Sequence, residues 1–436
     1  MIRLPVSTSP EGEQISMRVL FELDSKDYRP EWPRFVRPSV RAVIPRGSRI
    51  CLVHSQKYDY WKFPGGGPEA GENDLQALIR ETKEEAGLTV IPSSVKEYGH
   101  VPRLQADSGN KELIFEQDNR YYLCEAEAEK GEQCLDAYEA DEGFTPETAD
   151  PRTAILANTL SSHGPKDKRM LYREARVLET LIREGYFDIP ENRRGKTMFL
   201  CSSPELFGQD LLDGSNGFIT ELKKRVPENV NMLYIASSPD DPAANDRYSL
   251  QIKNAFEAAG IRPASFSVLD ARTLKDAGAL LAKSGLLFLA GGHVPTQNAF
   301  FQKLSLKERL NDWHGVIVSC SAGTMNSACL VYAVPEEEGE AASASYSRWL
   351  PGLSLTDTRV LPHWQTYGGA LVDGQRLIED IILKDSFLHR FLALPDGSYI
   401  LSENGKETVY GQAYTVEDGE IRPYTDPSEG SGHPAF

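Results

Sequence analysis

Three glutamates that closely follow a glycine-rich loop constrain the fold of this chain more than any other feature of its sequence. The loop spans residues 63–72, and Glu81, Glu84 and Glu85 follow it at positions i, i+3 and i+4, so on a helix they share one face. Three like charges on one face destabilise a helix unless a cation lies between them. Mg²⁺ prefers oxygen ligands and joins one or two carboxylates to the phosphates of a substrate. The segment therefore predicts a helix over 75–85 and a site for a metal-chelated diphosphate; a solvated acidic helix is the alternative.

The spacing of the whole segment resembles the signature of the Nudix hydrolases, G-x5-E-x7-R-E-U-x-E-E-x-G-U, where U is a bulky apolar residue. The one departure is Thr82, which stands where a larger apolar residue is usual. The resemblance covers residues ~35–187. It implies an α/β/α sandwich with a mixed sheet, in which the glutamates hold Mg²⁺ or Mn²⁺ and water attacks a nucleoside-diphosphate derivative. The matching residues, which include the positions that shape and brace the loop, are Gly66, Glu72, Arg80, Glu81, Glu84, Glu85, Gly87 and Leu88.

The general base of this family often lies outside the signature. Our candidate is Glu142, in the segment Asp141-Glu-Gly-Phe144, and a surface acid in a turn is the alternative interpretation. The identity of the nucleotide depends on loops that the signature does not describe.

A polar stretch that carries Pro and Gly, residues 188–196, separates two parts of the chain. Before it, apolar residues recur on one face of a predicted helix over 169–185. After it, short apolar strands alternate with helices, which is typical of a parallel sheet covered on both faces. The predicted strands are 230–235, 286–289 and 315–318, and the predicted helices are 246–259 and 297–310. We therefore expect two α/β domains, 35–187 and 197–425, joined by a linker at 188–196.

A second motif lies in residues 315–324, where an apolar strand leads into Ser319-Cys-Ser321-Ala-Gly. This order approximates the nucleophile elbow G-x-S-x-G, in which a tight strand-to-helix turn exposes the central serine. Ser321 is the candidate nucleophile, and the backbone N–H groups of Ala322 and Gly292 would face a developing oxyanion. A Ser-Ala-Gly turn that merely ends a strand is the alternative.

Two polar residues farther along the chain complete a candidate triad. His363 and Asp396 each follow a predicted strand, and the ends of parallel strands are where sites assemble. Together with Ser321 they would act as base, orienting acid and nucleophile. Taken singly, a structural histidine and a turn aspartate are the alternatives.

These elements and their order resemble the aspartyl dipeptidase (dipeptidase E) and cyanophycinase family of serine peptidases. The resemblance implies, for residues ~197–425, a doubly wound and mostly parallel sheet like that of class I glutamine amidotransferases, acting on small peptides or amides without a cofactor. Ser319 replaces the usual glycine of the elbow, and Asp396 takes the place of the dipeptidase's glutamate. Arg376 could meet a substrate carboxylate; an ordinary surface arginine is the alternative.

The charge of the chain limits its expected partners. Its 436 residues include 47 Lys and Arg against 64 Asp and Glu, a formal net charge of −17. Sequence-independent binding of nucleic acid needs an electropositive surface, so neither DNA nor RNA is expected. No apolar run approaches the roughly 18 residues of a membrane helix, and no signal peptide is evident, so we expect a cytoplasmic protein, with a homodimer as one possibility.

Three segments are expected to lie outside the two cores. Residues 1–34 form an N-terminal extension that packs on the first domain, 335–345 form a charged, solvated loop, and 426–436 form a flexible tail. The whole pattern predicts a bifunctional hydrolase. The alternatives are an active Nudix domain with a noncatalytic peptidase-like scaffold, and a serine peptidase that is regulated by nucleotide binding to the Nudix domain.

Overall fold

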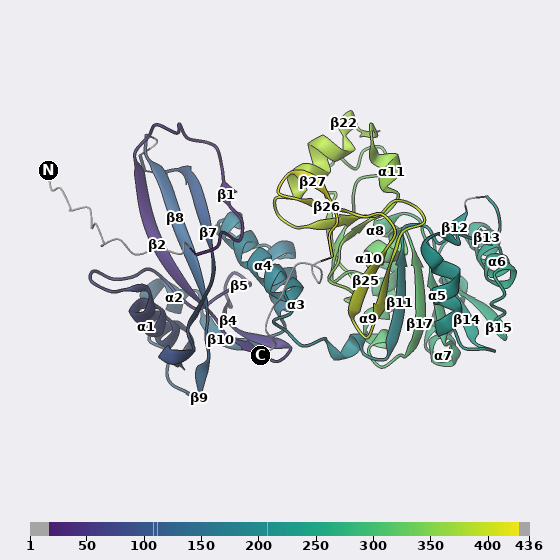
Figure 1. Ribbon diagram of the computed structural model, residues 1–436, viewed down its shortest axis with the longest axis horizontal. Helices are drawn as coiled ribbons and strands as arrows, with labels where there is room; N and C mark the ends of the chain where they lie inside the picture. The colour runs from purple at the N-terminus through teal and green to yellow at the C-terminus, as the bar shows by residue number, and fades with distance from the viewer. Residues whose placement is uncertain (1–16, 108, 111, 207, 427–436) are drawn as a thin grey trace. The chain divides into compact units, whose positions relative to one another are not determined.

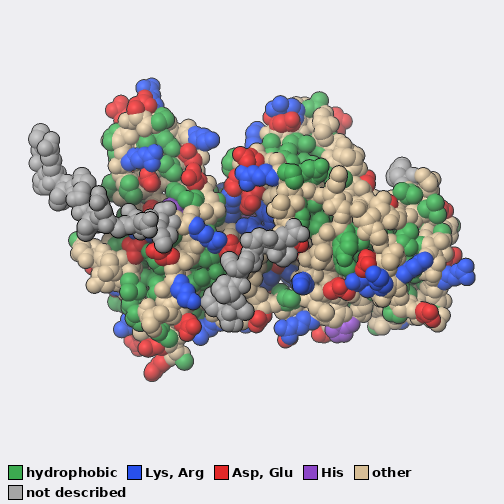
Figure 2. All heavy atoms as spheres, in the orientation of Figure 1, with side chains coloured by type: hydrophobic (Ala, Val, Ile, Leu, Met, Phe, Trp, Pro, Cys, Tyr) green, Lys and Arg blue, Asp and Glu red, His purple; other side chains and the backbone are tan. Residues whose placement is uncertain are grey.

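The chain divides into two compact units, Met1–Phe187 and Asp188–Phe436 (Figure 1). The computed structural model describes residues 17–426 except 108, 111 and 207, so the tail beyond 426 and the first 16 residues lie outside it. None of the helices it describes is both long enough and apolar enough to cross a membrane. On the face drawn in Figure 2, Lys and Arg side chains are interspersed with Asp and Glu.

The first unit is built around a mixed four-stranded sheet in the order β1-β7-β8-β2. β2 runs parallel to β8, β8 antiparallel to β7, and β7 parallel to β1. A second sheet has the order β10-β4-β3, with β5 also paired to β4, and β6 pairs with β9. The strands are β1 Leu23–Asp24, β2 Arg34–Val43, β3 Pro45–Arg46, β4 Arg49–Ser55, β5 Tyr60–Lys62, β6 Leu88–Val90, β7 Lys96–Ala106, β8 Ile114–Leu123, β9 Ala126–Lys130 and β10 Phe144–Ala149.

Helices lie on both sides of this sheet (Figure 1). Successive residues of a strand point to opposite faces, so Val40 and Ala42 of β2 join the apolar cluster under α1. On the other face, Tyr121 of β8 contacts the ring of Phe63, and the charge of Glu174 on α4 acts on its hydroxyl. The helices are α1 Asp74–Ala86, α2 Ala137–Asp141, α3 Pro151–Leu160 and α4 Lys168–Arg183.

The described part of the expected N-terminal extension packs on the first unit. β1 adds a strand to the edge of the sheet beside β7. Phe21 is buried, and the guanidinium of Arg176 on α4 lies 4.1 Å from the centre of its ring.

The second unit contains a seven-stranded sheet in the order β15-β14-β16-β17-β11-β24-β25. The first five strands are parallel, and β24 and β25 are antiparallel to their neighbours. Their bounds are β11 Lys196–Cys201, β14 Asn231–Ile235, β15 Ser265–Leu269, β16 Leu286–Leu289, β17 Gly315–Cys320, β24 Tyr399–Glu403 and β25 Lys406–Tyr410.

Both faces of this sheet are buried under helices. Met232 and Tyr234 of β14 pack in a cluster with α5 and α6, whereas Leu233 and Ile235 pack in the opposite cluster with α7, α8 and α9. A strand buried on both faces is continuously apolar, which is why these strands were visible in the sequence. The helices are α5 Phe218–Arg225, α6 Pro242–Ala258, α7 Ala277–Lys283, α8 Val294–Lys303 and α9 Leu306–Leu310.

Two expectations for this unit need correction. The helix predicted over 297–310 is two helices, because Ser305 adopts a left-handed conformation with φ 47° between them. The strands that precede His363 and Asp396 do not belong to the large sheet. They are β20 Val360–Leu361 and β23 Phe391–Ala393 of a separate sheet, β20-β23-β26-β27, completed by β26 Tyr414–Glu417 and β27 Glu420–Pro423.

The segment expected as a linker is partly built into the second unit. Arg193 is buried, donates to the carbonyl of Ser354 and forms an ion pair with Asp357 at 2.6 Å. β11 then begins at Lys196.

Two candidate active sites

The carboxylate helix α1 has a defined start and end. The Asn73 side chain accepts from the backbone N–H of Gln76 while the Gln76 side chain accepts from that of Asn73, a reciprocal cap that begins the helix. Gly87 ends it in the left-handed conformation, with φ 65°. A Cβ atom at Gly87 would lie 2.4 Å from the carbonyl oxygen of Gly131, so only glycine fits.

Arg80 holds the acidic groups around the loop in place. Its guanidinium donates to Glu72 at 2.8 and 2.9 Å, and to Glu81 and Glu84 at 2.9 Å each. It also donates to the carbonyl of Gly67. The hydrogen bonds from Arg80 lower the pKa of Glu72 to about 2. One arginine therefore fixes the loop and orients two of the three predicted metal ligands.

Glu85 is the buried member of the set, with only 2% of its surface exposed. Its carboxylate pairs with Lys62 and accepts from the backbone N–H of Gly65 at 2.9 Å. Burial raises its pKa to about 7, against the opposing effect of Lys62. Burial also raises the pKa of Glu81. Gly66 lies directly against Glu81, because a Cβ atom there would be 2.4 Å from a carboxylate oxygen.

Sequence reasoning missed a fourth carboxylate, Glu139 on α2. It is 5% exposed, accepts from the Tyr138 hydroxyl at 2.8 Å and caps α2 by accepting from the N–H of Asp136. Burial would raise its pKa, but hydrogen bonds with Glu85 and Tyr138 lower it further. Glu139 therefore acts directly on Glu85, and neighbouring carboxylates offer oxygen ligands to a cation. The only signal in the sequence was the spacing Asp136-x-x-Glu139 of a capping box.

Glu142, the predicted base, lies three residues farther on and has other partners. One carboxylate oxygen accepts from the Tyr60 hydroxyl at 2.8 Å, and the other pairs with Lys166. Glu142 is buried rather than a surface turn acid.

Contacts from α3 and α4 clamp the strand that enters the loop. Asn158 accepts from the N–H of Trp61 at 2.8 Å and donates to its carbonyl, and Glu174 accepts from the N–H of Phe63 at 2.9 Å. Thr82, the departure from the signature, is fully buried, and its hydroxyl has no hydrogen-bond partner among the residues that the structure describes.

In the second unit, Ser321 occupies a strained turn between β17 and α10 Ala322–Asn326. Its φ of 49° and ψ of −111° are unusual for any residue other than glycine. The Ser319 hydroxyl bonds with Thr324 at 2.7 Å and with the carbonyl of Phe199, which explains why a serine fits at the position of the usual glycine. The backbone of Ser321 thus has the geometry of a nucleophile elbow, in which the serine side chain is exposed at the end of a strand.

The glycine loop after β16 lies beside this serine. A Cβ atom at Gly291 would be 3.3 Å from the Cβ of Ser321. The N–H of Gly292 has no acceptor among the described residues. The N–H of Ala322 is at the first position of α10, where helices leave donors unsatisfied. Among the described residues neither predicted oxyanion donor is engaged in a hydrogen bond, and Gly291, the neighbour of Gly292, lies against Ser321.

His363 and Asp396 are in contact, with Nδ1 and Oδ1 2.7 Å apart. Two residues that sequence reasoning missed hold this pair. The Ser202 hydroxyl donates to Asp396 and accepts from the N–H of His363, both at 2.7 Å, and the Gln365 amide donates to Asp396 at 2.6 Å. Burial would raise the pKa of Asp396, but the hydrogen bonds from His363 and Ser202 lower it further.

Ser321 is linked to this pair indirectly. Its N–H donates to the carbonyl of Ser202 at 3.1 Å, so the elbow and the pair meet at the end of β11. Within the described chain, no hydrogen bond joins the Ser321 hydroxyl to His363, as is common before a substrate binds. Cys320 is buried beside Gly291, and burial raises its pKa.

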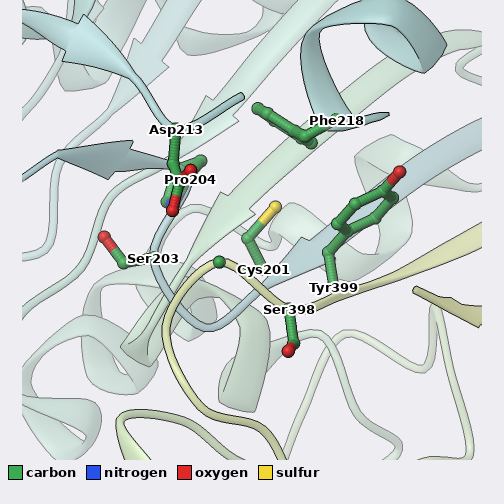
Figure 3. Close-up of a pocket in the computed structure, with 8 residues that line it drawn as sticks. Cys201, Ser203, Pro204, Asp213, Phe218, Ser398 and Tyr399 are labelled. Carbon is green, nitrogen blue, oxygen red and sulfur yellow. The ribbon is translucent and has the colours of Figure 1, made fainter. Parts of the chain in front are cut away.

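Two other features do not belong to this site. The hollow behind the end of β11 lies among Cys201, Ser203, Phe218 and Tyr399 and is too narrow to admit a water molecule (Figure 3). Arg376 is 58% exposed and pairs with Asp380 at 3.0 Å, which matches the surface-arginine alternative.

Comparisons with known proteins identify the first unit. The family model for the NUDIX domain matches residues 36–158. The RNA pyrophosphohydrolase of Halorhodospira halophila is 42% identical over 53 residues, a match that spans 12% of this chain and 29% of that protein.

Among solved structures, a peptidase from an acI-B1 Actinobacterium is similar with a TM-score of 0.38 and 15% identity, and the match covers 54% of this chain and 96% of that one.

A longer match settles the family. The RNA pyrophosphohydrolase of Helicobacter pylori is 31% identical over 162 residues, which are 34% of this chain and 96% of that protein. Because nearly the whole of that relative is matched and the signature residues are in place around α1, the chain belongs to the Nudix family of hydrolases.

Proposed function

We propose that the first unit hydrolyses a phosphoanhydride bond in a nucleoside-diphosphate derivative and that it uses Mg²⁺ or Mn²⁺. The observation that carries the proposal is the geometry of α1, where Arg80 donates to Glu81 and Glu84 at 2.9 Å each and the buried Glu85, on the same helix, accepts from the N–H of Gly65 in the glycine loop. Nudix hydrolases generally use divalent metal ions. A cation bound here would neutralise the diphosphate and lower the pKa of an attacking water.

The protein's own groups have distinct roles in this proposal. Glu81, Glu84 and Glu85 supply oxygen ligands, and Glu139 accepts the proton of the attacking water. Glu142 is held by Lys166 and Tyr60, so we assign the role of base to Glu139 in its place. Arg80 keeps the ligands oriented.

The names of the matched relatives suggest one substrate class to test. The H. pylori and H. halophila proteins are RNA pyrophosphohydrolases. A 5′-phosphorylated RNA end could enter the first site without the extended basic surface that binding along a nucleic-acid backbone requires. We keep the nucleoside-diphosphate derivative as the broader proposal and the RNA end as its special case.

The test is a substrate screen on the whole chain. Nucleoside-diphosphate derivatives and a 5′-triphosphorylated oligonucleotide are incubated with Mg²⁺, and phosphate or pyrophosphate release is measured. Activity should disappear when a chelator is added and return with excess metal. Hydrolysis at an unchanged rate in chelator would rule out the metal-dependent mechanism.

We propose a second activity, hydrolysis of a peptide or amide bond by Ser321, His363 and Asp396. The strained φ of Ser321 supports it, because such strain persists only where the surrounding fold maintains it. His363 would take the serine proton, Asp396 would orient the imidazole, and Gly292 and Ala322 would hold the oxyanion. The likeness of this unit to class I glutamine amidotransferases belongs to the same proposal.

A serine-directed fluorophosphonate probe tests the second activity. Wild-type protein should be labelled at Ser321, and Ser321→Ala should not. An unlabelled wild type with normal phosphohydrolase activity would instead favour a binding scaffold. Labelling whose rate changes strongly when nucleotide is added would favour the peptidase regulated through the Nudix unit.

A further inference from the structure

A buried arginine of the first unit, Arg41, lies beside the glycine loop. It is a residue of β2, and only 8% of its surface is exposed. Its side chain points to the face of the sheet opposite Val40 and Ala42, which pack under α1. The guanidinium donates to the carbonyl of Gly65, and the N–H of Gly65 donates to Glu85 at 2.9 Å. One residue of the loop thus links Arg41 to a predicted metal ligand.

The guanidinium of Arg41 has no counter-ion among the residues that the structure describes. No carboxylate in that part of the chain forms an ion pair with it, and the loop carbonyl is the one acceptor of its hydrogen bonds. Its Nε atom is buried without a partner there. The buried guanidinium of Arg173, by contrast, pairs with Glu174. A buried charge without a counter-ion is costly, so an anion beside Arg41 would be stabilising.

Two other cations beside the glycine loop and α1 are already occupied. Lys62 pairs with Glu85, and Arg80 pairs with three carboxylates of the loop and the helix. Burial raises the pKa of Glu81 and Glu85, and the nearby cations, Arg41 included, oppose that effect. A guanidinium has five N–H groups, so Arg41 lies close to the predicted metal ligands and still has donors for an anion.

We infer that Arg41 is a substrate-binding residue of the first site and that its guanidinium donates to a phosphate oxygen of the substrate's diphosphate. The inference rests on the proposed phosphohydrolase function and extends it to a residue outside the Nudix signature. A cation held by α1 would join the carboxylates to the same diphosphate, so the phosphate and Arg41 would meet beside Gly65. Arginine suits this role, because its planar guanidinium donates two parallel hydrogen bonds to a phosphate.

The charge of Arg41 should act on two ligands in opposite directions. It attracts a phosphate anion but repels a metal cation on the neighbouring carboxylates. Arg41→Met should therefore weaken the binding of α,β-methylene-ADP, a nucleoside diphosphate with a nonhydrolysable bridge, by about tenfold or more. The same change should leave the affinity for Mn²⁺ alone unchanged or raise it. A merely structural role of Arg41 in the loop would lower both affinities.

Calorimetric titration of the whole chain measures both affinities, first for Mn²⁺ without nucleotide and then for the analogue at saturating Mn²⁺. Arg41→Lys keeps the charge but loses the planar fork. It should weaken analogue binding severalfold without lowering the Mn²⁺ affinity, which keeps the test decisive if Arg41→Met does not fold. Arg49→Met makes the same change of charge at an exposed position of β4 and should alter neither affinity.

Contrary results can be told apart. If Mn²⁺ binding and analogue binding fall together in a folded variant, Arg41 only supports the loop. If analogue binding does not change, or if Arg49→Met weakens it equally, the guanidinium does not contact the diphosphate. In these cases metal-dependent hydrolysis by the wild type leaves the proposed function standing. If the wild type neither binds the analogue nor hydrolyses any diphosphate, the proposed function falls and the role of Arg41 falls with it.

Discussion

The two candidate sites of this chain are assembled in different ways. In the first unit, the loop glycines and three of the four carboxylates come from one stretch, residues 65–87, and a single helix sets their spacing. In the second unit, Ser202, Ser321, His363 and Asp396 each follow a strand, and those strands belong to two separate sheets. The first site is a local motif completed by one distant residue, Glu139. The second exists only when distant segments have packed.

The two sites also differ in what holds their reactive groups. Arg80 and Lys62 neutralise the carboxylates of α1, and removal of Glu85 leaves the buried Lys62 without its ion pair. The serine centre depends instead on backbone strain at Ser321 and on short hydrogen bonds around Asp396. We therefore expect substitutions in one unit to leave the other unit's chemistry intact, and the following experiments test that separation.

The largest effect is expected from His363→Ala. Without a base the Ser321 hydroxyl keeps its proton, so the rate of fluorophosphonate labelling should fall by about 10⁴-fold or more. Phosphohydrolase activity of the same protein should not change. Cys320→Ala is the control, because this thiol is buried away from the elbow's exposed side and labelling should be nearly intact. Labelling that follows Cys320 would place the nucleophile one residue earlier.

Glu85→Gln should have the opposite selectivity. The amide cannot ligate a hard cation as a carboxylate does, and phosphohydrolase activity should fall by at least about a hundredfold. Labelling of Ser321 should continue at the wild-type rate. A variant that loses both activities while it remains folded, as judged by circular dichroism, would contradict the independence of the two sites.

A matched pair, Glu139→Gln and Glu142→Gln, sharpens the description of the first site. Glu139 shares a hydrogen bond with Glu85, so its substitution should lower kcat by about ten- to a hundredfold and weaken metal binding. Glu142 is held by Lys166 and Tyr60, so its substitution should mainly lower thermal stability. If Glu142→Gln produced the larger loss of kcat, the base would be Glu142, the residue that the sequence predicts.

The metal affinity of the first unit should depend on pH. Burial raises the pKa of Glu85 from 4.5 to about 7, so in the absence of metal a proton occupies this carboxyl below that value. Metal must displace the proton, and the apparent affinity for Mg²⁺ should therefore fall by up to about tenfold for each pH unit below 7 and level off above it. Calorimetric titration at several pH values measures this. The slope should flatten in Glu85→Gln, and a flat wild-type profile between pH 5.5 and 7 would contradict the assignment.

The smallest effect is expected from Ser202→Ala. This variant loses one hydrogen bond to Asp396 and one from the N–H of His363 but keeps the triad itself. Loss of two such bonds should slow Ser321 labelling by about three- to tenfold. Because Asp396 would lose a bond that stabilises its charged form, its pKa should rise toward the ordinary range. An unchanged rate would mean that Gln365 alone orients the acid.

Particular elements show how far sequence reasoning reached. The sequence pattern of α1 and the apolar runs of β14, β16 and β17 were enough to predict these elements. Each of them lies within a few residues of its predicted bounds. The helix predicted over 297–310 is broken at Ser305, whose positive φ gives no signal in a sequence of good helix formers. Glu139 and Glu142 are equally plausible acids in a linear sequence, and their partners Glu85 and Lys166 separate them only in three dimensions.

The spacing of residues along the chain was enough to predict four features. They are the carboxylate face of α1, the glycine loop, the serine elbow and the division into two units, and each depends on residues that are neighbours in sequence. Only the tertiary structure shows that Glu139 is the acid that interacts with Glu85 and that Arg376 forms an ion pair with Asp380. It also shows that Glu340, in the loop at 336–340, contacts His293. Those outcomes depend on burial and on charge pairs between segments far apart in sequence. Such contacts form only when the cores have packed, so no local pattern could record them.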